Sequence, residues 1–258
     1  MKVEALSSRD NPLCVRVRKL LRDPVAYRKL GWVWLEGDHL GAAWRSRGGS
    51  GDEAVFTEAA WARPERRALA QGAARVAVVP EGLMRELSSL DSPADCGFLI
   101  PWSGSGPVTP GVDTVVLDRL QDAGNVGAIL RSAAALGVRQ VVALKGTAAL
   151  WSPKVLRAGM GSHFALGLVE AAEEGALGAL GLPLLGTSSH TAAELHRAAL
   201  PSPCAWVFGH EGQGVSAALL ARCQLTVRIP QPGGEESLNV ASAAAICLYE
   251  SLRRRLAQ

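Results

Sequence analysis

The sequence predicts a mixed α/β fold whose C-terminal half contains a mainly parallel sheet. Short apolar runs typical of buried strands alternate with longer stretches that have helical spacing. In addition, 48% of the 258 residues are hydrophobic and only 20% are charged, so the chain can bury a substantial core.

A boundary between two domains is expected in the segment PWSGSGPVTPG at 101–111. This segment contains three Pro, three Gly and two Ser, a composition that sustains neither helix nor sheet. We therefore predict one domain over 1–107 and a second over 112–258.

The N-terminal domain is expected to alternate helices and strands. Its predicted elements are a basic helix at 12–22, a strand at 32–37, a helix at 38–46, a strand at 54–57, a helix at 60–71, and a strand at 75–79 followed by a short helix.

The C-terminal domain has a more regular rhythm, which predicts the mainly parallel sheet. Its strand-like runs lie at 114–118, 140–144, 164–169, 183–187, 204–208 and 224–229. The last helix is predicted to begin after Ser237, which can cap it, and to run to about Arg255, where arginines complement the helix dipole.

Composition narrows the class of protein further. Residues 1–47 hold 10 Lys/Arg against 5 Asp/Glu, although the net charge of the chain is only +3. Such a basic end suits contacts with phosphates, and a solvated helix face explains it equally well.

The five cysteines lack C-x-x-C spacing, which favours reduced, buried thiols. A charged N-terminus and the lack of a long apolar run favour the cytoplasm and no membrane.

Three stretches place polar or glycine residues directly after a strand-like run: 117–137, 206–216 and 229–245. Open α/β sheets place their ligand-binding loops at such positions, so the three stretches predict one composite site.

In the first stretch, Asn125 is expected at a helix start, with Arg131 roughly 9 Å further along the axis. Together they could grip a phosphate or ribose, although an N-cap asparagine and a surface arginine explain the pattern equally well. In the second stretch, glycines around Glu211 predict a sharply turning loop that can lie against a ligand. A plain strand-to-helix turn would also account for those glycines.

The third stretch places Ser237 and Asn239 at the entry to an alanine-rich helix. Capping alone could account for Ser237. A polar cluster at the start of an otherwise apolar, small-residue helix favours a site.

These three stretches resemble the motifs of the SpoU/TrmH-type RNA ribose 2′-O-methyltransferases of the SPOUT superfamily. The matching segments are Asp118 to Ala133, Gly209-His210-Glu211 with Gly214, and Ile229-Pro230 with Ser237-Leu238-Asn239. SPKVLRAGMGSHF at 152–164 resembles the family's R-x-S-x-G segment. SSRDNPLCVRVRKLL and WLEGDHL resemble the ribosomal-protein-like RNA-binding domain of many members. Two positions depart from the pattern: Ala123 replaces a proline and Gly159 replaces a serine.

The resemblance implies a deep trefoil knot in the C-terminal domain, a pocket for S-adenosylmethionine and a homodimer whose protomers together complete the RNA site. The expected cofactor-binding residues are Thr187, Gly209, Glu211, Ile229 and Leu238. The expected catalytic residues are Arg131, Asn125, Ser237 and Asn239. The expected RNA-binding residues are Arg9, Arg16, Arg18, Lys19, Arg22 and Arg157. No metal is implied, and the five histidines show no ligand spacing.

Arg131 is the residue expected to act on the ribose. A guanidinium is a poor base, so we expect it to orient the 2′-hydroxyl and stabilise the developing alkoxide, with Asn125, Ser237 and Asn239 holding it and the ribose. A substrate phosphate could take the proton.

The sequence leaves other functions open. The separate N-terminal domain favours ribosomal RNA over transfer RNA as substrate. A non-catalytic RNA-binding protein with this fold should lack Arg131 or the Ser-Leu-Asn cluster, and both are present. A nicotinamide-dependent dehydrogenase should carry G-x-G-x-x-G after its first strand, which is missing.

Overall fold

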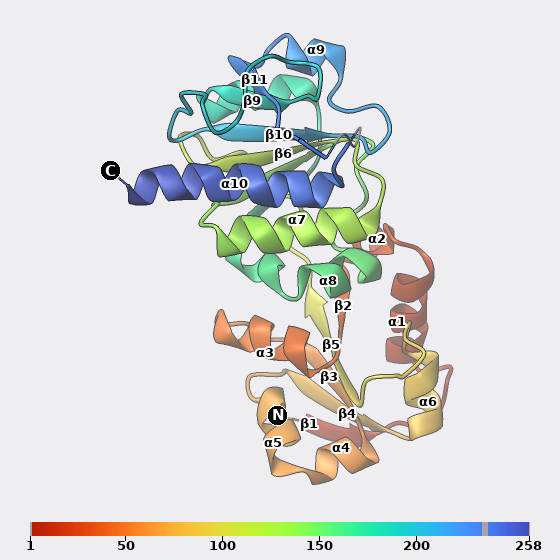
Figure 1. Cartoon of the computed structure of the whole chain (residues 1–258). Helices are drawn as coiled ribbons and strands as arrows, with labels where there is room; N and C mark the ends of the chain where they lie inside the picture. The colour runs from red at the N-terminus through yellow and green to blue at the C-terminus, as the bar shows by residue number, and fades with distance from the viewer. Residues whose placement is uncertain (1, 234–236, 258) are drawn as a thin grey trace. The chain divides into compact units, whose positions relative to one another are not determined.

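The computed structural model describes residues 2–233 and 237–257. The chain forms two compact units (Figure 1). The first comprises Met1–Gly104 and Trp151–Phe164, and the second comprises Ser105–Leu150 and Ala165–Gln258. The inserted segment Trp151–Phe164 was not anticipated in the N-terminal unit. None of the helices in the described ranges is long and apolar enough to cross a membrane.

The N-terminal unit is built on a five-stranded sheet of order β1-β4-β3-β5-β2. Its strands are β1 (Lys2–Ala5), β2 (Trp32–Glu36), β3 (Glu53–Thr57), β4 (Arg75–Val79) and β5 (Cys96–Pro101). Strand β4 pairs in parallel with β1 and β3, whereas β5 pairs antiparallel with β2 and β3. Strands β1 and β5 were not predicted from the sequence.

Short helices surround this sheet. They are α1 (Pro12–Arg22), α2 (Ala26–Leu30), α3 (Asp38–Ser46), α4 (Glu58–Ala62), α5 (Pro64–Arg67), the 3₁₀ turn η1 (Ala68–Ala70), α6 (Glu81–Glu86) and α8 (Pro153–Gly159). The single helix predicted at 60–71 is wrong. Pro64 begins a new helix because its ring removes a backbone donor and fixes φ, so the segment breaks into α4, α5 and η1.

The inserted segment is held to this unit by aromatic side chains. The ring of Phe164, in the 3₁₀ turn η2 (Ser162–Ala165), lies 5.3 Å from that of Trp44 on α3. Within the inserted segment itself, the ring of Trp151 lies 5.1 Å from that of His163. Packing of this kind explains why a segment that follows β7 in the chain clusters with the N-terminal sheet.

The C-terminal unit contains a six-stranded sheet of order β11-β9-β10-β6-β7-β8. Its strands are β6 (Thr114–Asp118), β7 (Gln140–Leu144), β8 (Gly167–Ala172), β9 (Leu184–Thr187), β10 (Ala205–Gly209) and β11 (Leu225–Val227). Every neighbouring pair is parallel, which confirms the predicted sheet type. How the chain threads through itself, and thus the trefoil knot, stays a prediction.

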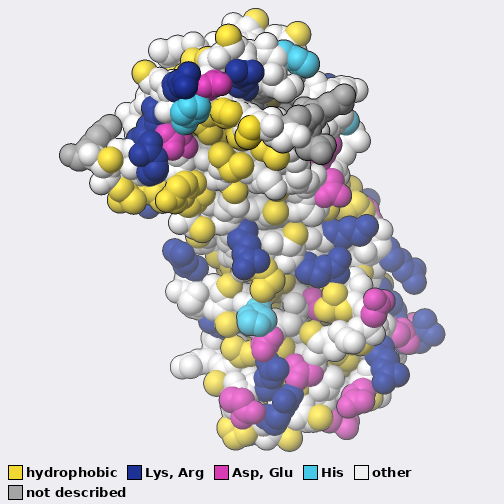
Figure 2. Space-filling view, viewed as in Figure 1, with side chains coloured by type: hydrophobic (Ala, Val, Ile, Leu, Met, Phe, Trp, Pro, Cys, Tyr) yellow, Lys and Arg dark blue, Asp and Glu magenta, His cyan; other side chains and the backbone are white. Residues whose placement is uncertain are grey.

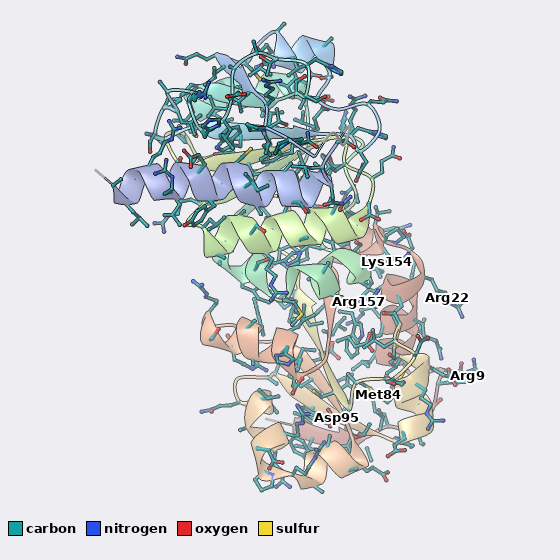
Figure 3. The ribbon with its side chains drawn as sticks, viewed as in Figure 1. Arg9, Arg22, Met84, Asp95, Lys154 and Arg157 are labelled. Carbon is teal, nitrogen blue, oxygen red and sulfur yellow. The ribbon has the colours of Figure 1, made fainter. Side chains whose placement is uncertain are left out.

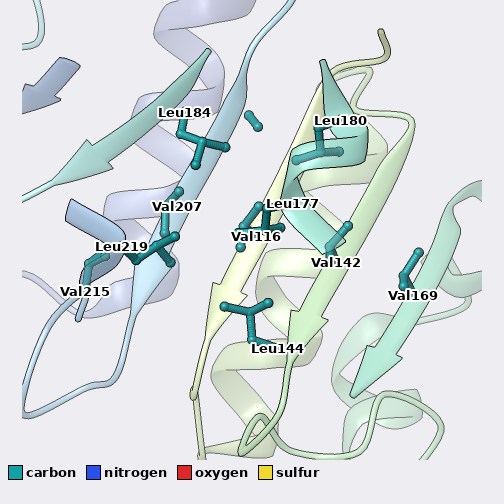
Figure 4. Close-up of a cluster of buried hydrophobic side chains, with 11 residues drawn as sticks. Val116, Val142, Leu144, Val169, Leu177, Leu180, Leu184, Val207, Val215 and Leu219 are labelled. Carbon is teal, nitrogen blue, oxygen red and sulfur yellow. The ribbon is translucent and has the colours of Figure 1, made fainter. Parts of the chain in front are cut away.

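Helices cover both faces of this sheet: α7 (Ala123–Ala135), the 3₁₀ segment η3 (Glu174–Leu180), α9 (Ala217–Leu220) and α10 (Val240–Leu256). Helices α7 and α10 pack side by side (Figure 1). Leucines of η3 and α9 pack with valines of the central strands, including Val116, Val142 and Val207 (Figure 4). Because the strands are parallel, the loops that follow them all emerge at the same edge of the sheet.

One buried ion pair organises the end of α3. Arg45 donates to both carboxylate oxygens of Asp52, at 2.5 and 2.8 Å, and to the carbonyls of Gly49 and Leu69. The Asp52 side chain is fully buried. Arg45→Ala should therefore lower the free energy of unfolding by about 3–5 kcal/mol, because it leaves an uncompensated buried carboxylate.

Urea unfolding followed by circular dichroism measures this loss. The matched control is Arg47→Ala, two residues away and exposed, which should change stability little. Equal stability of the two variants would contradict the assigned role of Arg45.

Candidate functional site

The three motif stretches meet at the carboxyl edge of the C-terminal sheet. Strands β10 and β6 pair so that Gly209 lies opposite Asp118, and β9 and β11 end beside each other at Thr187 and Val227. A cavity of about 540 Å³ opens at this edge, within the size range of small-molecule sites. We call it the cofactor-site cavity.

The loop after β10 forms one wall of this cavity and needs glycine for steric reasons. A Cβ on Gly209 would lie only 2.1 Å from the Gly214 carbonyl carbon and the Val215 nitrogen. The loop folds back on itself, with Gly214 N donating to His210 O at 2.8 Å and Gly212 N donating to His210 Nδ1 at 3.0 Å. The predicted turning loop is thus confirmed. Gly209 allows the end of β10 and the returning chain at Gly214 and Val215 to lie this close together.

Two carboxylates join this loop to the end of β6. Asp118 Oδ2 accepts from Ser216 N at 2.7 Å, and Arg119 Nε donates to Asp118 Oδ1 at 2.9 Å. Burial alone would raise the pKa of Asp118, but these hydrogen bonds outweigh it and hold the pKa below its ordinary value. Asp118 is therefore ionised at neutral pH.

The second carboxylate, Glu211, reaches across in the opposite direction. It accepts from Asp122 N at 3.1 Å, from Gln121 N at 3.3 Å and from Asn125 Nδ2 at 3.2 Å. Burial raises the pKa of Glu211, but hydrogen bonds from its own amide, from Asn125 and from the backbone of Asp122 and Gln121 outweigh this effect, so the pKa lies below its ordinary value. Glu211 is therefore an anchor for the first motif as well as a cavity residue.

The third motif joins this network through Asn239. Its Nδ2 donates to Asn125 Oδ1 at 2.9 Å, and its Oδ1 caps α10 by accepting from Ala241 N and Ser242 N. The predicted cap at Ser237 is wrong, because the cap is Asn239, two residues later, and α10 begins at Val240. Likewise Asp122, and not Asn125, caps α7 by accepting from Asn125 N at 2.7 Å.

All five expected cofactor residues line the cofactor-site cavity: Thr187, Gly209, Glu211, Ile229 and Leu238. Of the expected catalytic residues, Ser237 and Asn239 also line it, and Asn125 is hydrogen-bonded to two cavity residues. Arg131 does not line it. It is exposed on α7 and makes no hydrogen bond or ion pair with a described residue. These roles stay predictions.

Gln231 is a cavity residue that sequence reasoning missed. It lines the cofactor-site cavity, and its buried Oε1 has no donor among the described residues. Its position directly after Ile229-Pro230 is the only signal that could have singled it out.

The expected RNA-binding residues fall into two groups. Arg9, Arg16 and Arg18 are engaged within the protein: Arg16 pairs with Glu53 at 3.1 Å, and Arg9 and Arg18 pair with Glu86. Lys19, Arg22 and Arg157, by contrast, have no ion pair with a described residue.

The two departures from the family pattern have local explanations. Ala123 occupies the first position of α7, where proline is favoured but an alanine continues the helix without strain. A Cβ on Gly159 would lie 2.6 Å from Cε1 of His163, so the buried histidine ring takes the space of a side chain at 159.

The comparisons with known proteins agree with this geometry. The SpoU rRNA Methylase family model matches residues 113–249, and the chain belongs to this family. It is 32% identical to an uncharacterized tRNA/rRNA methyltransferase of Synechocystis, with 99% of this chain and 96% of that protein covered. It is 31% identical to a 23S rRNA (uridine(2479)-2′-O)-methyltransferase of Streptomyces viridochromogenes, with 70% and 68% covered.

Solved structures show a similarity of fold over nearly the whole chain. An RNA 2′-O ribose methyltransferase shares 31% identity with a TM-score of 0.81, covering 98% of this chain and 100% of that one. The AdoMet-bound rRNA methyltransferase from Sinorhizobium meliloti shares 25% identity with a TM-score of 0.84, covering 98% of each chain.

The steric role of Gly209 leads to a prediction. Gly209→Ala should abolish ligand binding in the cofactor-site cavity, because the added Cβ would force the loop away from β10. Titration calorimetry with S-adenosylmethionine measures the loss.

The matched control is Gly178→Ala in η3, which lies outside the cavity lining. A Cβ there would meet no atom within 4 Å, and affinity should stay within about threefold of the wild type. If both variants bind equally well, the loop geometry does not shape the cavity.

Proposed function

We propose that this protein transfers a methyl group from S-adenosylmethionine to a ribose 2′-hydroxyl of ribosomal RNA. The observation that carries this proposal is the chain of hydrogen bonds from Glu211 through Asn125 to Asn239, which joins all three motifs beside the cofactor-site cavity. The similarity to RNA 2′-O-methyltransferases over nearly the whole chain supports it.

The residues of the cavity fit this cofactor. Ile229 and Leu238 offer apolar surface for an adenine ring, while Thr187 and the glycine-rich loop offer polar groups for ribose and amino-acid parts. When bound, S-adenosylmethionine supplies a methyl group on a positively charged sulfur. This activated methyl is transferred without a metal in the reaction we propose.

Arg131 is the proposed catalytic residue. In-line transfer requires the 2′-oxygen to be held against the methyl carbon while its proton leaves. Because Arg131 has no partner among the described residues, its guanidinium is free to orient that oxygen and stabilise the developing negative charge. A substrate phosphate is the proposed proton acceptor.

The proposed active form is a homodimer in the cytoplasm. Arg131, Gly124 and Ala135 are exposed on α7, and none of them lines the cofactor-site cavity of its own chain. On α10, Ile246 and Tyr249 are 41% and 56% exposed, and hydrophobic side chains gather over this helix (Figure 2). A second protomer on these faces would bury the apolar patch and bring Arg131 to the partner's site.

The activity is tested by transfer of labelled methyl from S-adenosylmethionine to total RNA from a strain that lacks this gene. We expect label in the ribosomal fraction, at one 2′-O-methylated ribose. Label in the transfer RNA fraction would favour the alternative substrate, since one relative is named a tRNA/rRNA methyltransferase. Cofactor binding without any label would favour a non-catalytic RNA-binding protein.

Arg131→Ala should abolish methyl transfer, by at least about 100-fold in kcat, while cofactor affinity stays nearly unchanged. The reason is that Arg131 lies outside the cofactor-site cavity of its own chain. Arg139→Ala, which removes another exposed arginine just beyond the same helix, is the control and should retain activity. A wild-type rate for Arg131→Ala would refute its catalytic role.

Tyr249→Glu should shift the protein from dimer to monomer, because it places a charge in the proposed apolar interface. Light scattering coupled to size exclusion measures the mass. Gln224→Glu, an exposed change in the turn before β11, should leave the dimer intact. A monomeric wild type would rule out the assembly.

A further inference from the structure

A second cavity, of about 240 Å³, lies within the N-terminal unit. We call it the β2–α3 cavity, because the end of β2 and the first turn of α3 form it together with the loop at 89–94 and α8. Its walls are largely apolar and include Trp34, Leu40, Leu90, Ala94, Leu156 and Met160. It is smaller than the roughly 300–1,000 Å³ of sites for drug-sized ligands, so a single heteroaromatic ring suits it better.

The acidic residues at this cavity are occupied by other groups. Glu36 accepts hydrogen bonds from the hydroxyl of Ser88 and from the backbone and hydroxyl of Ser89. Asp38 is paired with Arg66. These donors partly offset the negative charge of the two carboxylates. In return, Glu36 holds residues 88–89 in place and Asp38 holds α5.

The basic residues are not occupied in this way. Arg157 lines the cavity, is exposed, and makes no ion pair or hydrogen bond with a described residue. Lys154 lies one helical turn earlier on α8, is also exposed and likewise has no ion pair in the described ranges (Figure 3). The cavity thus combines an apolar interior with the available positive charge of Arg157 in its lining.

Trp34 adds an aromatic surface to this wall. The residue is only 2% exposed, so its ring is held firmly by the packing around it. A fixed indole beside an apolar cavity offers a flat surface against which a second planar ring can pack.

We propose that the β2–α3 cavity holds one unpaired nucleobase of the substrate RNA, with a neighbouring phosphate at Arg157. Proteins that read RNA bind bases splayed out of loops and bulges, against apolar or aromatic surfaces, and neutralise the adjacent phosphates with arginine or lysine. The inference rests on the proposed function, because it takes RNA to be the substrate. It adds the requirement that this RNA present an extruded base at a point bound by the N-terminal unit.

The test fills the cavity. Ala94 lines it from a partly exposed loop, and Ala94→Phe should occupy the space meant for the base. In methyl-transfer assays with ribosomal RNA from a strain lacking this gene, the KM for RNA should rise about tenfold or more, while kcat and the KM for S-adenosylmethionine stay unchanged. The matched control is Ala59→Phe on the exposed side of α4, which should behave as the wild type.

Salt dependence separates base from phosphate contacts. Filter binding of the same RNA should show that Arg157→Ala reduces the slope of log affinity against log salt by about 0.7, as expected for one lost phosphate contact to single-stranded RNA. Ala94→Phe should weaken binding without changing that slope. Urea unfolding of each variant checks that the fold persists.

The outcomes are distinguishable. If the wild type methylates ribosomal RNA and Ala94→Phe keeps its KM for RNA, the cavity holds no base and this inference fails while the proposed function stands. If Ala94→Phe alters only self-association, the cavity receives a second copy of the chain, which also overturns the inference. If the wild type transfers no methyl group, the proposed function itself fails, and filter binding still reports whether RNA enters the cavity.

Discussion

Two carboxylates that cross between neighbouring strand ends hold the functional edge of the C-terminal unit together. Asp118, at the end of β6, binds the backbone of Ser216 beyond the β10 loop. Glu211, within the β10 loop, binds backbone groups beyond β6. Because each carboxylate anchors the other strand's loop, the two loops cannot move independently. Both pKa values lie below their ordinary range, so the anchors are charged at neutral pH.

This reciprocal arrangement positions the rest of the site. With Glu211 fixed, its third hydrogen bond orients Asn125, which in turn accepts from Asn239 at the start of α10. Asn239 has two tasks, since its Oδ1 caps α10 while its Nδ2 holds the first motif. A polar cluster that resembles simple helix capping in the sequence thus fixes the positions of α7 and α10 relative to the loop after β10.

The chain separates cofactor contacts from the proposed catalytic group. The cofactor-site cavity is lined by the loops after β9, β10 and β11 together with the start of α10, whereas Arg131 lies on the outward face of α7. In the homodimer that we propose, a second protomer would cover the exposed apolar side chains Ile246 and Tyr249 of α10. This division explains why a free arginine on α7 is compatible with a stable fold: an exposed guanidinium stays hydrated until RNA arrives.

The sequence by itself determined five strands of the parallel sheet, helices α1 and α3, and the three site loops, because apolar periodicity, glycine turns and capping residues act over a few neighbouring positions. The strand predicted at 164–169 is displaced, since η2 occupies its start and β8 begins at Gly167. Tertiary structure decided what depends on distant partners. Asp122 and Asn239 cap the helices in place of Asn125 and Ser237, β5 enters antiparallel, and Trp151–Phe164 joins the N-terminal unit through the ring of Trp44. The pairing of Glu211 with backbone 89 positions earlier depends on strand order, which local sequence does not encode.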